Sequence, residues 1–342
     1  MKKIALVLAV TMIFGFLTAC SGNTSSTTTG SATPAETTAA PAKIPELSIA
    51  CNQPGQSWVL IGNSMSEYLK GTMELVVVPG STYGNILTTN TRDTDFGITA
   101  STSLGSAKNG VRYYTEHGKQ ENVTFVASIY KHHLRGFTTN PDIKVWSDIK
   151  GHSVCYGPPG GEGFDYNPLL YSYMGFSDAD VELKTMPFAD AVEQMKNKQL
   201  DAILNCTPTP YAIFDDLVYS DPNNAHLIQM DKETAERLKS EWEGFNYDDY
   251  STIPGNIWAF EEPLYAPYQL ITFIANKDVS DEDVYNFTQC IYDNFEALEG
   301  IVPAFQGIEE GKDGMIHNVA GLPVHPGAEK FWTEKGLTVV NE

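Results

Sequence analysis

The chain has 342 residues, of which 42% are hydrophobic and 11% aromatic, so most of it is expected to fold around one large core or two lobes. It carries 22 lysine and arginine residues against 43 aspartate and glutamate residues, a formal net charge of −21. A field of this sign repels phosphate backbones and anionic lipids, which argues against a nucleic-acid binder and against electrostatic docking on a membrane.

The N-terminus has the pattern of a bacterial lipoprotein signal. Lys2 and Lys3 precede 14 largely apolar residues, 4–17, which are too few to span a bilayer comfortably, and the chain then reaches Cys20 through small residues. We therefore expect a signal peptide over 1–19 and lipidation of Cys20, which would anchor the protein to the cell membrane on its extracytoplasmic side. An ordinary signal peptide with an incidental cysteine is the alternative.

Residues 20–46 are expected to form a linker after the lipidated cysteine. The stretch is rich in serine, threonine and proline, and Ile44 is its only large apolar side chain, so it cannot build a core. No later segment approaches 18 consecutive apolar residues, which predicts a domain tethered to the membrane rather than one that spans it.

From residue 47 onward, strand-like and helix-like patterns alternate. The first series has a strand over 47–50, a helix over 57–69, a strand over 74–78 that we expect to be buried on both faces, a strand over 95–99, and two extended runs over 122–130 and 134–139. The second series has strands over 153–156, 181–186 and 202–204, a helix near 164–175, a helix that starts at Pro187, and a long helix over 281–298.

This alternation predicts an α/β fold with a mostly parallel sheet and helices on both faces. Two such series indicate two lobes. We expect lobe 1 at 47–138 plus 256–342 and lobe 2 at 139–255, with the crossings between them near 134–145 and 250–260.

Four cysteines remain after Cys20. None of Cys51, Cys155, Cys206 and Cys290 belongs to a CxxC pair or has a histidine at ligand spacing, which argues against a zinc site. Buried free thiols are the first interpretation. A Cys155–Cys206 disulfide is the alternative, because the strands that carry these residues would be neighbours.

Two glycine-rich loops directly follow strands, at the place where open α/β sheets bind ligands. Their glycine, hydroxyl, amide and acidic residues are Gly80, Ser81, Thr82 and Asn85 in the first loop (79–85), and Gly160, Gly161, Glu162 and Gly163 in the second (157–163). Backbone N–H groups in such loops, and the helix N-termini behind them, favour a carboxylate. One loop from each lobe would form the two sides of a cleft, although glycine-rich loops often only turn a chain.

No catalytic constellation emerges from the sequence. His132 and His133 are adjacent, so on a strand they point to opposite faces, and no HExxH or GxSxG motif occurs. Neither glycine-rich loop has the lysine of a phosphate-binding P-loop. We therefore expect a protein that is not an enzyme and that needs no cofactor or metal ion.

Short motifs occur in a fixed order along nearly the whole folded chain, at 58–62, 80–85, 95–97, 146–151, 156–160, 200–202 and 323–328. Together they resemble the TAXI family of solute receptors, the extracytoplasmic binding components of TRAP transporters. The resemblance implies a two-lobed periplasmic-binding-protein fold of the second type, with a ligand cleft between the lobes. It further implies closure of the lobes around a small organic solute without catalysis, and docking on a TRAP-type membrane permease.

The resemblance also implies where the solute would lie. The implied contacts are aromatic side chains, the two loops and one hydroxyl: Trp58, Tyr130 and Trp258, the loop with Gly80, Ser81, Thr82 and Asn85, the loop from Gly160 to Gly163, and Thr207.

Glu162 departs from the family, which commonly has a small serine or threonine segment at this place. A carboxylate there would repel a dicarboxylate, and when buried it needs a cation or several donors. We therefore expect a solute of amino acid or carboxylate type with a positive or strong donor group beside its acid. The alternative is that Glu162 points outward. Two other functions stay open, a stand-alone binding or sensing lipoprotein of the same fold and a hydrolase-like enzyme.

Overall fold

The computed structural model describes residues 44–54, 56–158, 161–249, 255–261, 263–308 and 310–341, without the side chains of 306 and 307. The predicted signal peptide, Cys20, most of the predicted linker and Gly160 lie outside the described residues. Residues Ile44–Glu342 form one compact unit. No helix in the described part of the chain is both long and apolar enough to cross a membrane.

The strands are β1 (Glu46–Ala50), β2 (Glu74–Val78), β3 (Phe96–Ala100), β4 (Val123–Thr138), β5 (Ser153–Cys155), β6 (Glu182–Lys184), β7 (Ala202–Thr207), β8 (His226–Ile228), β9 (Asn246–Asp249), β10 (Tyr265–Asn276), β11 (His317–Asn318) and β12 (Val340–Asn341). The α-helices are α1 (Ser57–Tyr68), α2 (Thr82–Thr91), α3 (Ser101–Asn109), α4 (Gly163–Tyr173), α5 (Phe188–Lys196), α6 (Ala212–Ser220), α7 (Lys232–Glu241), α8 (Asp281–Asp293), α9 (Phe295–Ile301) and α10 (Pro326–Glu334).

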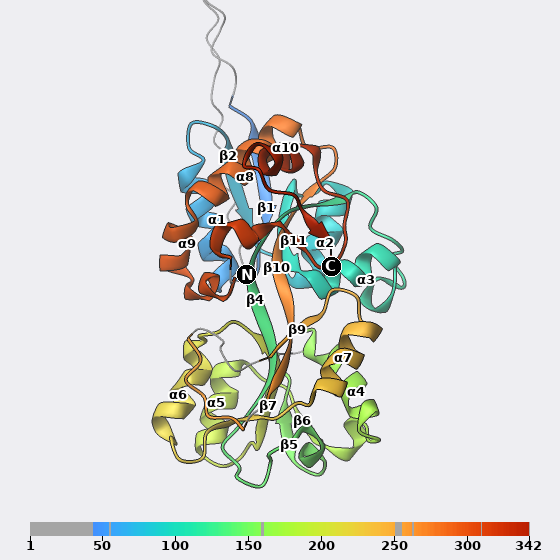
Figure 1. Cartoon of the computed structure of the whole chain (residues 1–342), viewed down its shortest axis with the longest axis vertical. Coiled ribbons are helices and arrows are strands. Elements are labelled where there is room, and N and C mark those ends of the chain that lie inside the picture. Colours follow the sequence, from blue (N-terminus) through green and yellow to red (C-terminus); the bar gives the residue numbers. More distant parts are fainter. Residues whose placement is uncertain are drawn as a thin grey trace, which may run out of the picture. The chain divides into compact units, whose positions relative to one another are not determined.

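The large sheet has the order β2-β1-β3-β10-β4-β7-β5-β6. At one end β1 pairs in parallel with β2 and β3, and at the other end β5 pairs in parallel with β6 and β7. Between them β4 and β10 are antiparallel to each other and to their outer neighbours. Figure 1 shows that β4 and β10 run from an upper lobe, which contains β1 to β3, into a lower lobe, which contains β5 to β7.

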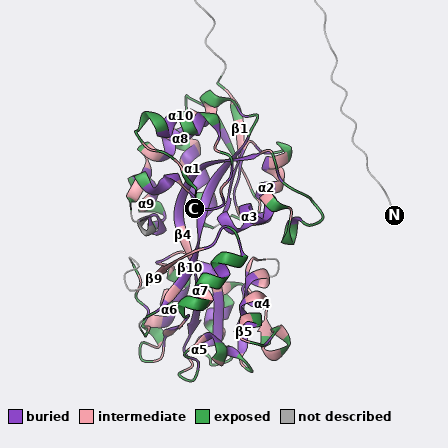
Figure 2. Cartoon of the chain, turned by 45° about the vertical axis from the view of Figure 1, so that its right-hand side comes forward, coloured by how far each residue is buried: buried purple, intermediate pink, exposed green. Residues whose placement is uncertain are grey.

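Each lobe has its own buried core, and β4 contributes to both. Tyr130 belongs to the upper cluster with Ile49 and Phe96. Leu134 and Phe137 belong to two clusters of the lower lobe. Figure 2 shows the central strands buried and the outer faces of the helices exposed, as expected for helices that cover a sheet.

Three predictions about single elements are wrong. The strand over 74–78 is not buried on both faces, because β2 lies at the end of the sheet and leaves Val76 48% exposed. The runs over 122–130 and 134–139 form one strand, β4, because residues 131–133 pair with β10. The helix predicted over 281–298 ends at Asp293 and a separate helix, α9, begins at Phe295; Asn294 lies between them, and its backbone N–H and its side chain both donate to the carbonyl of Cys290.

All four described cysteines are free and buried. The strands of Cys155 and Cys206 are neighbours, as the sequence predicts, but Cys155 lies opposite Ile203. Cys206 is three residues farther along its strand, roughly 10 Å away. A disulfide needs Cα atoms about 4.4–6.8 Å apart, so the alternative of a Cys155–Cys206 bridge is wrong.

Candidate functional site

The loop after β2 is built around the side-chain amide of Asn85. This buried amide donates to the carbonyl oxygens of Cys51 (2.8 Å) and Ile98 (2.7 Å) and accepts from the backbone N–H of Ser81 (3.0 Å). A Cβ atom at Gly80 would lie 2.0 Å from the Asn85 Oδ1 atom, so only glycine fits there. Asn85 therefore connects the segments that follow β1 and β2 with strand β3.

Ser81 and Thr82 start helix α2. The Ser81 hydroxyl caps the helix by accepting from the backbone N–H of Gly84 (3.2 Å), which satisfies one of its first free donors. The carbonyl of Thr82 accepts from the Thr99 hydroxyl at the end of β3 (2.8 Å). The structure thus places the first predicted loop at a helix N-terminus above the carboxyl ends of the upper strands.

The described part of the second loop leads into helix α4. A Cβ atom at Gly163 would lie 3.0 Å from the Cβ and carbonyl oxygen of Tyr156, whereas Gly161 has room for a side chain. Next to this loop, the Tyr83 hydroxyl of α2 donates to Asp165 in the first turn of α4. The helices that follow the two predicted loops therefore meet.

Glu162 lies on the boundary between the lobes, and its carboxylate is directed at the upper lobe. It accepts hydrogen bonds from the Ser103 hydroxyl, the Thr102 hydroxyl (3.2 Å) and the Gln269 amide (2.9 Å). Burial raises the pKa of Glu162, against the effect of these three hydrogen bonds. No ion pair with Glu162 occurs among the residues that the structure describes. Its charge is thus met by several neutral donors rather than by a cation.

The predicted aromatic residues fall into two groups. The Trp58 indole of α1 donates to the hydroxyl of Tyr130 on β4 (3.0 Å), and burial raises the pKa of this tyrosine to about 12. Trp258 instead belongs to a lower-lobe cluster, where its indole donates to Asp215 (2.9 Å) and its ring lies 4.9 Å from that of Phe137. Its described contacts do not include the two loops.

Thr207 ends β7, and its hydroxyl accepts from the guanidinium of Arg135 (2.7 Å). Arg135 is 4% exposed and also donates to the carbonyl of Pro208 (2.7 Å). A buried guanidinium is a strong donor for carboxylates, so Arg135 adds a cation that the sequence analysis did not single out.

The other residues that the sequence analysis missed are Thr102, Ser103 and Gln269. A signal for two of them was present, because the run Ser101-Thr102-Ser103 directly follows a strand, as the two predicted loops do. Gln269 gave no such signal, since it lies inside the long apolar strand β10.

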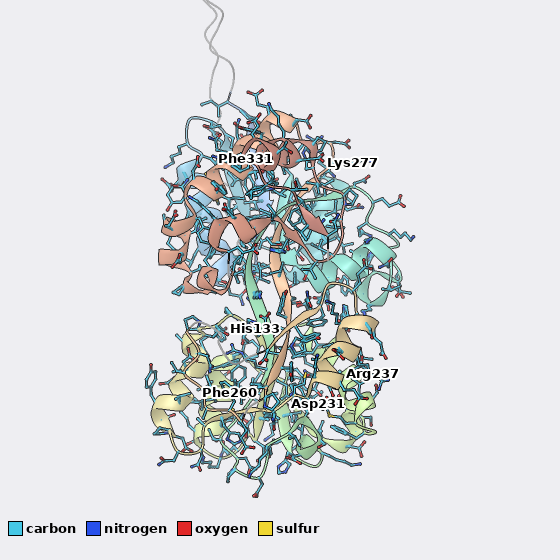
Figure 3. The ribbon with its side chains drawn as sticks, in the orientation of Figure 1. His133, Asp231, Arg237, Phe260, Lys277 and Phe331 are labelled. Carbon is cyan, nitrogen blue, oxygen red and sulfur yellow. The ribbon has the colours of Figure 1, made fainter. Side chains whose placement is uncertain are left out.

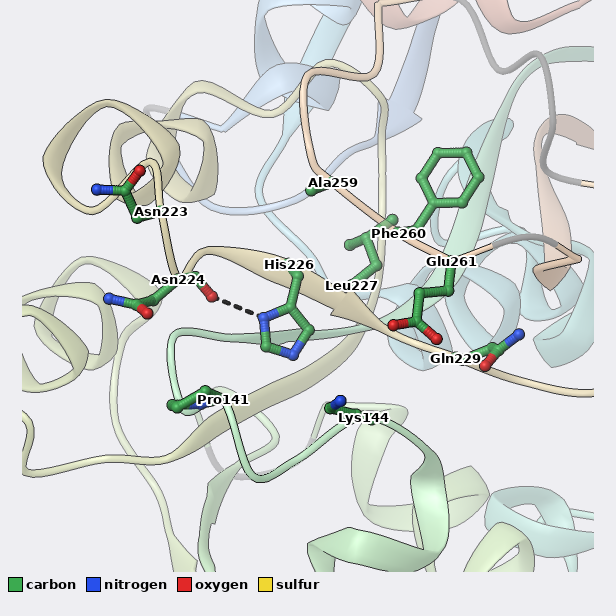
Figure 4. A pocket seen from close by; sticks show the side chains of 10 residues that line it. All are labelled: Pro141, Lys144, Asn223, Asn224, His226, Leu227, Gln229, Ala259, Phe260 and Glu261. Atoms are coloured by element: carbon green, nitrogen blue, oxygen red, sulfur yellow. Dashed lines mark hydrogen bonds between the residues drawn. The ribbon is translucent and has the colours of Figure 1, made fainter.

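Two cavities of the described structure lie away from the predicted residues. One, of about 290 Å³, lies in the lower lobe around His226 and Lys144; Figure 4 shows the His226 ring directed at the carbonyl of Asn224, with Nδ1 at 2.6 Å from the oxygen. The other, of about 270 Å³, is lined by both lobe-crossing strands and by Asp248 of β9. Neither is lined by any residue implied by the resemblance.

Beside the second cavity, charged side chains from β4 and β9 gather at the middle of β4. Asp248 accepts from Lys131 (3.0 and 2.9 Å) and interacts with the Nε2 atom of His133 (2.9 Å). His133 is 2% exposed and lies at the junction of the lobes (Figure 3). Burial of Asp248 raises its pKa, but the hydrogen bond and charge of His133 and the charge of Lys131 outweigh this and lower it overall.

The chain matches the family model described as the NMT1-like family over residues 49–336, and it therefore belongs to this family. Similar solved structures include the alkanesulfonate-binding protein SsuA from Xanthomonas axonopodis pv. citri bound to MOPS, with 14% identity, 85% of this chain and 84% of that chain covered, and a TM-score of 0.44. The periplasmic aliphatic sulphonate binding protein SsuA from Escherichia coli has 13% identity, coverage of 84% and 79%, and a TM-score of 0.44. An ancestral arginine-binding protein bound to arginine has 14% identity, coverage of 76% and 97%, and a TM-score of 0.41.

The predicted fold class, an α/β periplasmic-binding-protein fold of the second type with two lobes, is confirmed. The prediction of a mostly parallel sheet is wrong, because β4 and β10 pair antiparallel with each other and with their neighbours, which makes the sheet mixed. The lobe boundaries and the position of the solute stay predictions. The family match is broader than the TAXI receptors, so the resemblance to that group is taken up below.

Proposed function

We propose that this protein is an extracytoplasmic receptor that holds a small organic solute, of amino acid or carboxylate type, between its two lobes without changing it chemically. The observation that carries the proposal is the meeting of polar residues from both lobes at strand carboxyl ends: Thr102 and Ser103 from the upper lobe contact Glu162 from the lower lobe. Ligands of α/β proteins bind at such strand ends. Membership of the NMT1-like family supports the same function.

The finer proposal is a TAXI-type receptor that is anchored through Cys20 and delivers its solute to a TRAP-type membrane permease. Its support is the resemblance in the motifs and the lipoprotein pattern of residues 1–20. Solute uptake by cells that express a TRAP permease together with this chain, and no uptake with a Cys20→Ser chain, is the expected result. Solute binding with no transfer from the loaded receptor to the permease would favour the stand-alone lipoprotein.

A thermal-shift screen tests solute binding directly. The panel contains organic acids, amino acids and small amines, and a true ligand at 100 times its dissociation constant is expected to stabilise the protein by about 2.7 kcal/mol. Calorimetry on each hit should then give a stoichiometry near one, with the solute recovered unchanged. Turnover of any hit would contradict the proposal and favour an enzyme.

Replacing Glu162 with glutamine tests the expected solute chemistry. Without the negative charge, a solute with an ammonium group is expected to bind about tenfold more weakly, which corresponds to roughly 1.4 kcal/mol, while a dicarboxylate is expected to bind more tightly. Glu193→Gln is the control, because Glu193 is an exposed lower-lobe carboxylate whose ion pair with Lys196 lies within its own helix, α5. If Glu162→Gln and the wild type bind both solutes equally, the charge-pairing hypothesis is wrong.

A further inference from the structure

Helix α3 of the upper lobe is covered in part by the lower lobe. Seven of its nine residues, from Ser101 to Ala107, are buried. The covering segment is 241–245, which leaves α7 and leads into β9. Its side chains Trp242 and Phe245 belong to the main lower-lobe cluster, so the segment is fixed to that lobe. Figures 1 and 2 both show α3 beside α7.

Two glycines let the two backbones touch. A Cβ atom at Gly105 of α3 would lie 2.3 Å from the carbonyl oxygen of Glu243, and one at Gly244 would lie 2.2 Å from the carbonyl oxygen of Ser101. Gly244 also has φ +99°, a conformation that side chains with a Cβ rarely adopt. The two backbones are in contact, so there is no space for a Cβ atom between them. Any side chain at Gly105 or Gly244 must therefore push α3 and the segment 241–245 apart.

Buried polar contacts hold the same interface. The Ser101 hydroxyl donates to the carbonyl of Gly244 (2.6 Å), and the Trp242 indole donates to the carbonyl of Thr102 (3.2 Å). The guanidinium of Arg112 lies 3.6 Å above the Trp242 ring. Separating the lobes here would leave the Ser101 hydroxyl, the Trp242 indole N–H and the two carbonyls that they contact without these partners, which is unfavourable for buried polar groups.

An ion pair continues the interface toward solvent at the other end of α3. Lys108 lies 2.7 Å from Glu243, and Asn109 donates to the same carboxylate. Together these contacts, between α3 with Arg112 and the segment 241–245, are named the clasp below.

The opposite side of the molecule is different. There α1 of the upper lobe faces α6 of the lower lobe in the view of Figure 1. Within the described ranges, no hydrogen bond or ion pair joins α1 to α6. Among the described residues, hydrogen bonds between side chains or backbone of the two lobes therefore concentrate at α2 and α3.

We propose that the clasp is a permanent third connection between the lobes, beside β4 and β10, and that it is the pivot of their movement. The lobes part between α1 and α6, while α3 and the segment 241–245 stay together. Together with the proposed function, this movement gives the solute access from the α1–α6 side only.

Distances between spin labels test the pivot without any solute, so the result does not depend on the proposed function. One label pair spans the clasp, at Glu116→Cys and Ser240→Cys, and the other spans the opposite side, at Leu60→Cys and Tyr219→Cys, all at exposed positions. The chain carries Cys20→Ser, and its four described cysteines are buried, so they do not compete for the label. The clasp pair is expected to give one narrow distance distribution and the opposite pair a distribution at least twice as wide. Equal widths in the two pairs, whether narrow or broad, would overturn the proposal.

Gly105→Ala then tests the cause. An alanine in a helix interior normally stabilises relative to glycine, and Gly300→Ala is the matched control, because Gly300 lies in α9 with no atom near its Cβ position. Gly300→Ala is expected to keep or raise the melting temperature, whereas Gly105→Ala is expected to lower it and to broaden the clasp distances. A narrow clasp distribution in Gly105→Ala would contradict the proposal. If Gly105→Ala does not fold, the proposal is tested by the two label pairs in the chain that keeps Gly105.

Discussion

Replacing Asn85 with alanine is expected to lower the free energy of unfolding by roughly 2–4 kcal/mol and to abolish solute binding in the protein that remains folded. The substitution removes all three hydrogen bonds of the buried amide and leaves the carbonyls of Cys51 and Ile98 and the N–H of Ser81 without these partners. Each buried backbone group that loses its hydrogen-bond partner lowers the free energy of unfolding by about 1–3 kcal/mol. The loop 79–85 also loses the side chain that holds it in place. Urea unfolding and calorimetry with a solute identified by the screen measure the two effects.

Asn197→Ala is the control for this prediction. The Asn197 side chain is exposed and makes a single hydrogen bond, to the carbonyl of Glu193 (2.9 Å), at the end of α5. Its loss is expected to change the stability by less than about 0.5 kcal/mol. If the two variants unfold at the same urea concentration, Asn85 does not support the loop as described.

The stability of the protein is expected to fall by roughly 4 kcal/mol between pH 8 and pH 5 because of two adjacent histidines. Burial lowers the pKa of His133 to about 4, although Asp248 acts in the opposite direction. Burial and the charges of His133 and Arg135 lower the pKa of His132 to about 3.

Both histidines are thus neutral in the folded protein, while in the unfolded chain they take up protons below about pH 6.5. The stabilisation is complete above pH 6.5 and is lost as the pH falls toward the folded-state pKa values, by about 2 kcal/mol per histidine at pH 5. Other groups modify this slope. His325, whose pKa burial lowers, adds to it, and Glu162, whose pKa burial raises, opposes it.

Unfolding by urea at pH 8, 7, 6 and 5 measures this slope. His132→Gln and His133→Gln are each expected to remove about half of it, whereas His117→Gln, at an exposed position, is expected to leave it unchanged. Equal stability of the wild type at pH 7 and pH 5 would contradict the prediction. A loss of pH dependence in His117→Gln as large as that in His132→Gln or His133→Gln would also contradict it.

Local patterns were enough to predict most of the outer strands and several helices. The strands that became β1, β2 and β3 and the helix that became α1 differ from their predicted bounds by one or two residues at most. In helix α8, Val284, Phe287 and Ile291 are buried at helical spacing. In each of these segments the apolar spacing alone distinguishes helix from strand.

The missed features depend on contacts between distant residues. The run Tyr265–Asn276 is mostly apolar, but only its pairing with β3 and β4 makes it the antiparallel strand that joins the lobes. The edge position of β2 depends on the order of the whole sheet. A periodic pattern shows that a strand exists, not which strands lie beside it.

In the candidate site, too, local patterns predicted some residues, while others depend on contacts between distant parts of the chain. Strand-end loops marked Ser81 and Glu162, because glycine and hydroxyl residues follow strands in the sequence. The partners of Glu162 lie 59, 60 and 107 residues away from it in the sequence. The family resemblance implies that Trp258 contacts the solute, whereas its hydrogen bond to Asp215 depends on how the lower lobe packs.

Strand β4 fixes the spacing between the cores of the two lobes. Tyr130 fills the upper core and Leu134 a lower one, with only three residues between them on a single pleated strand. Inserting or deleting one residue there would turn every later side chain of the strand to the wrong face, so one of the two cores would lose its filling whatever the other did. Homologous chains are therefore expected to vary freely in the loops that follow the outer strands but to keep the length of this strand constant.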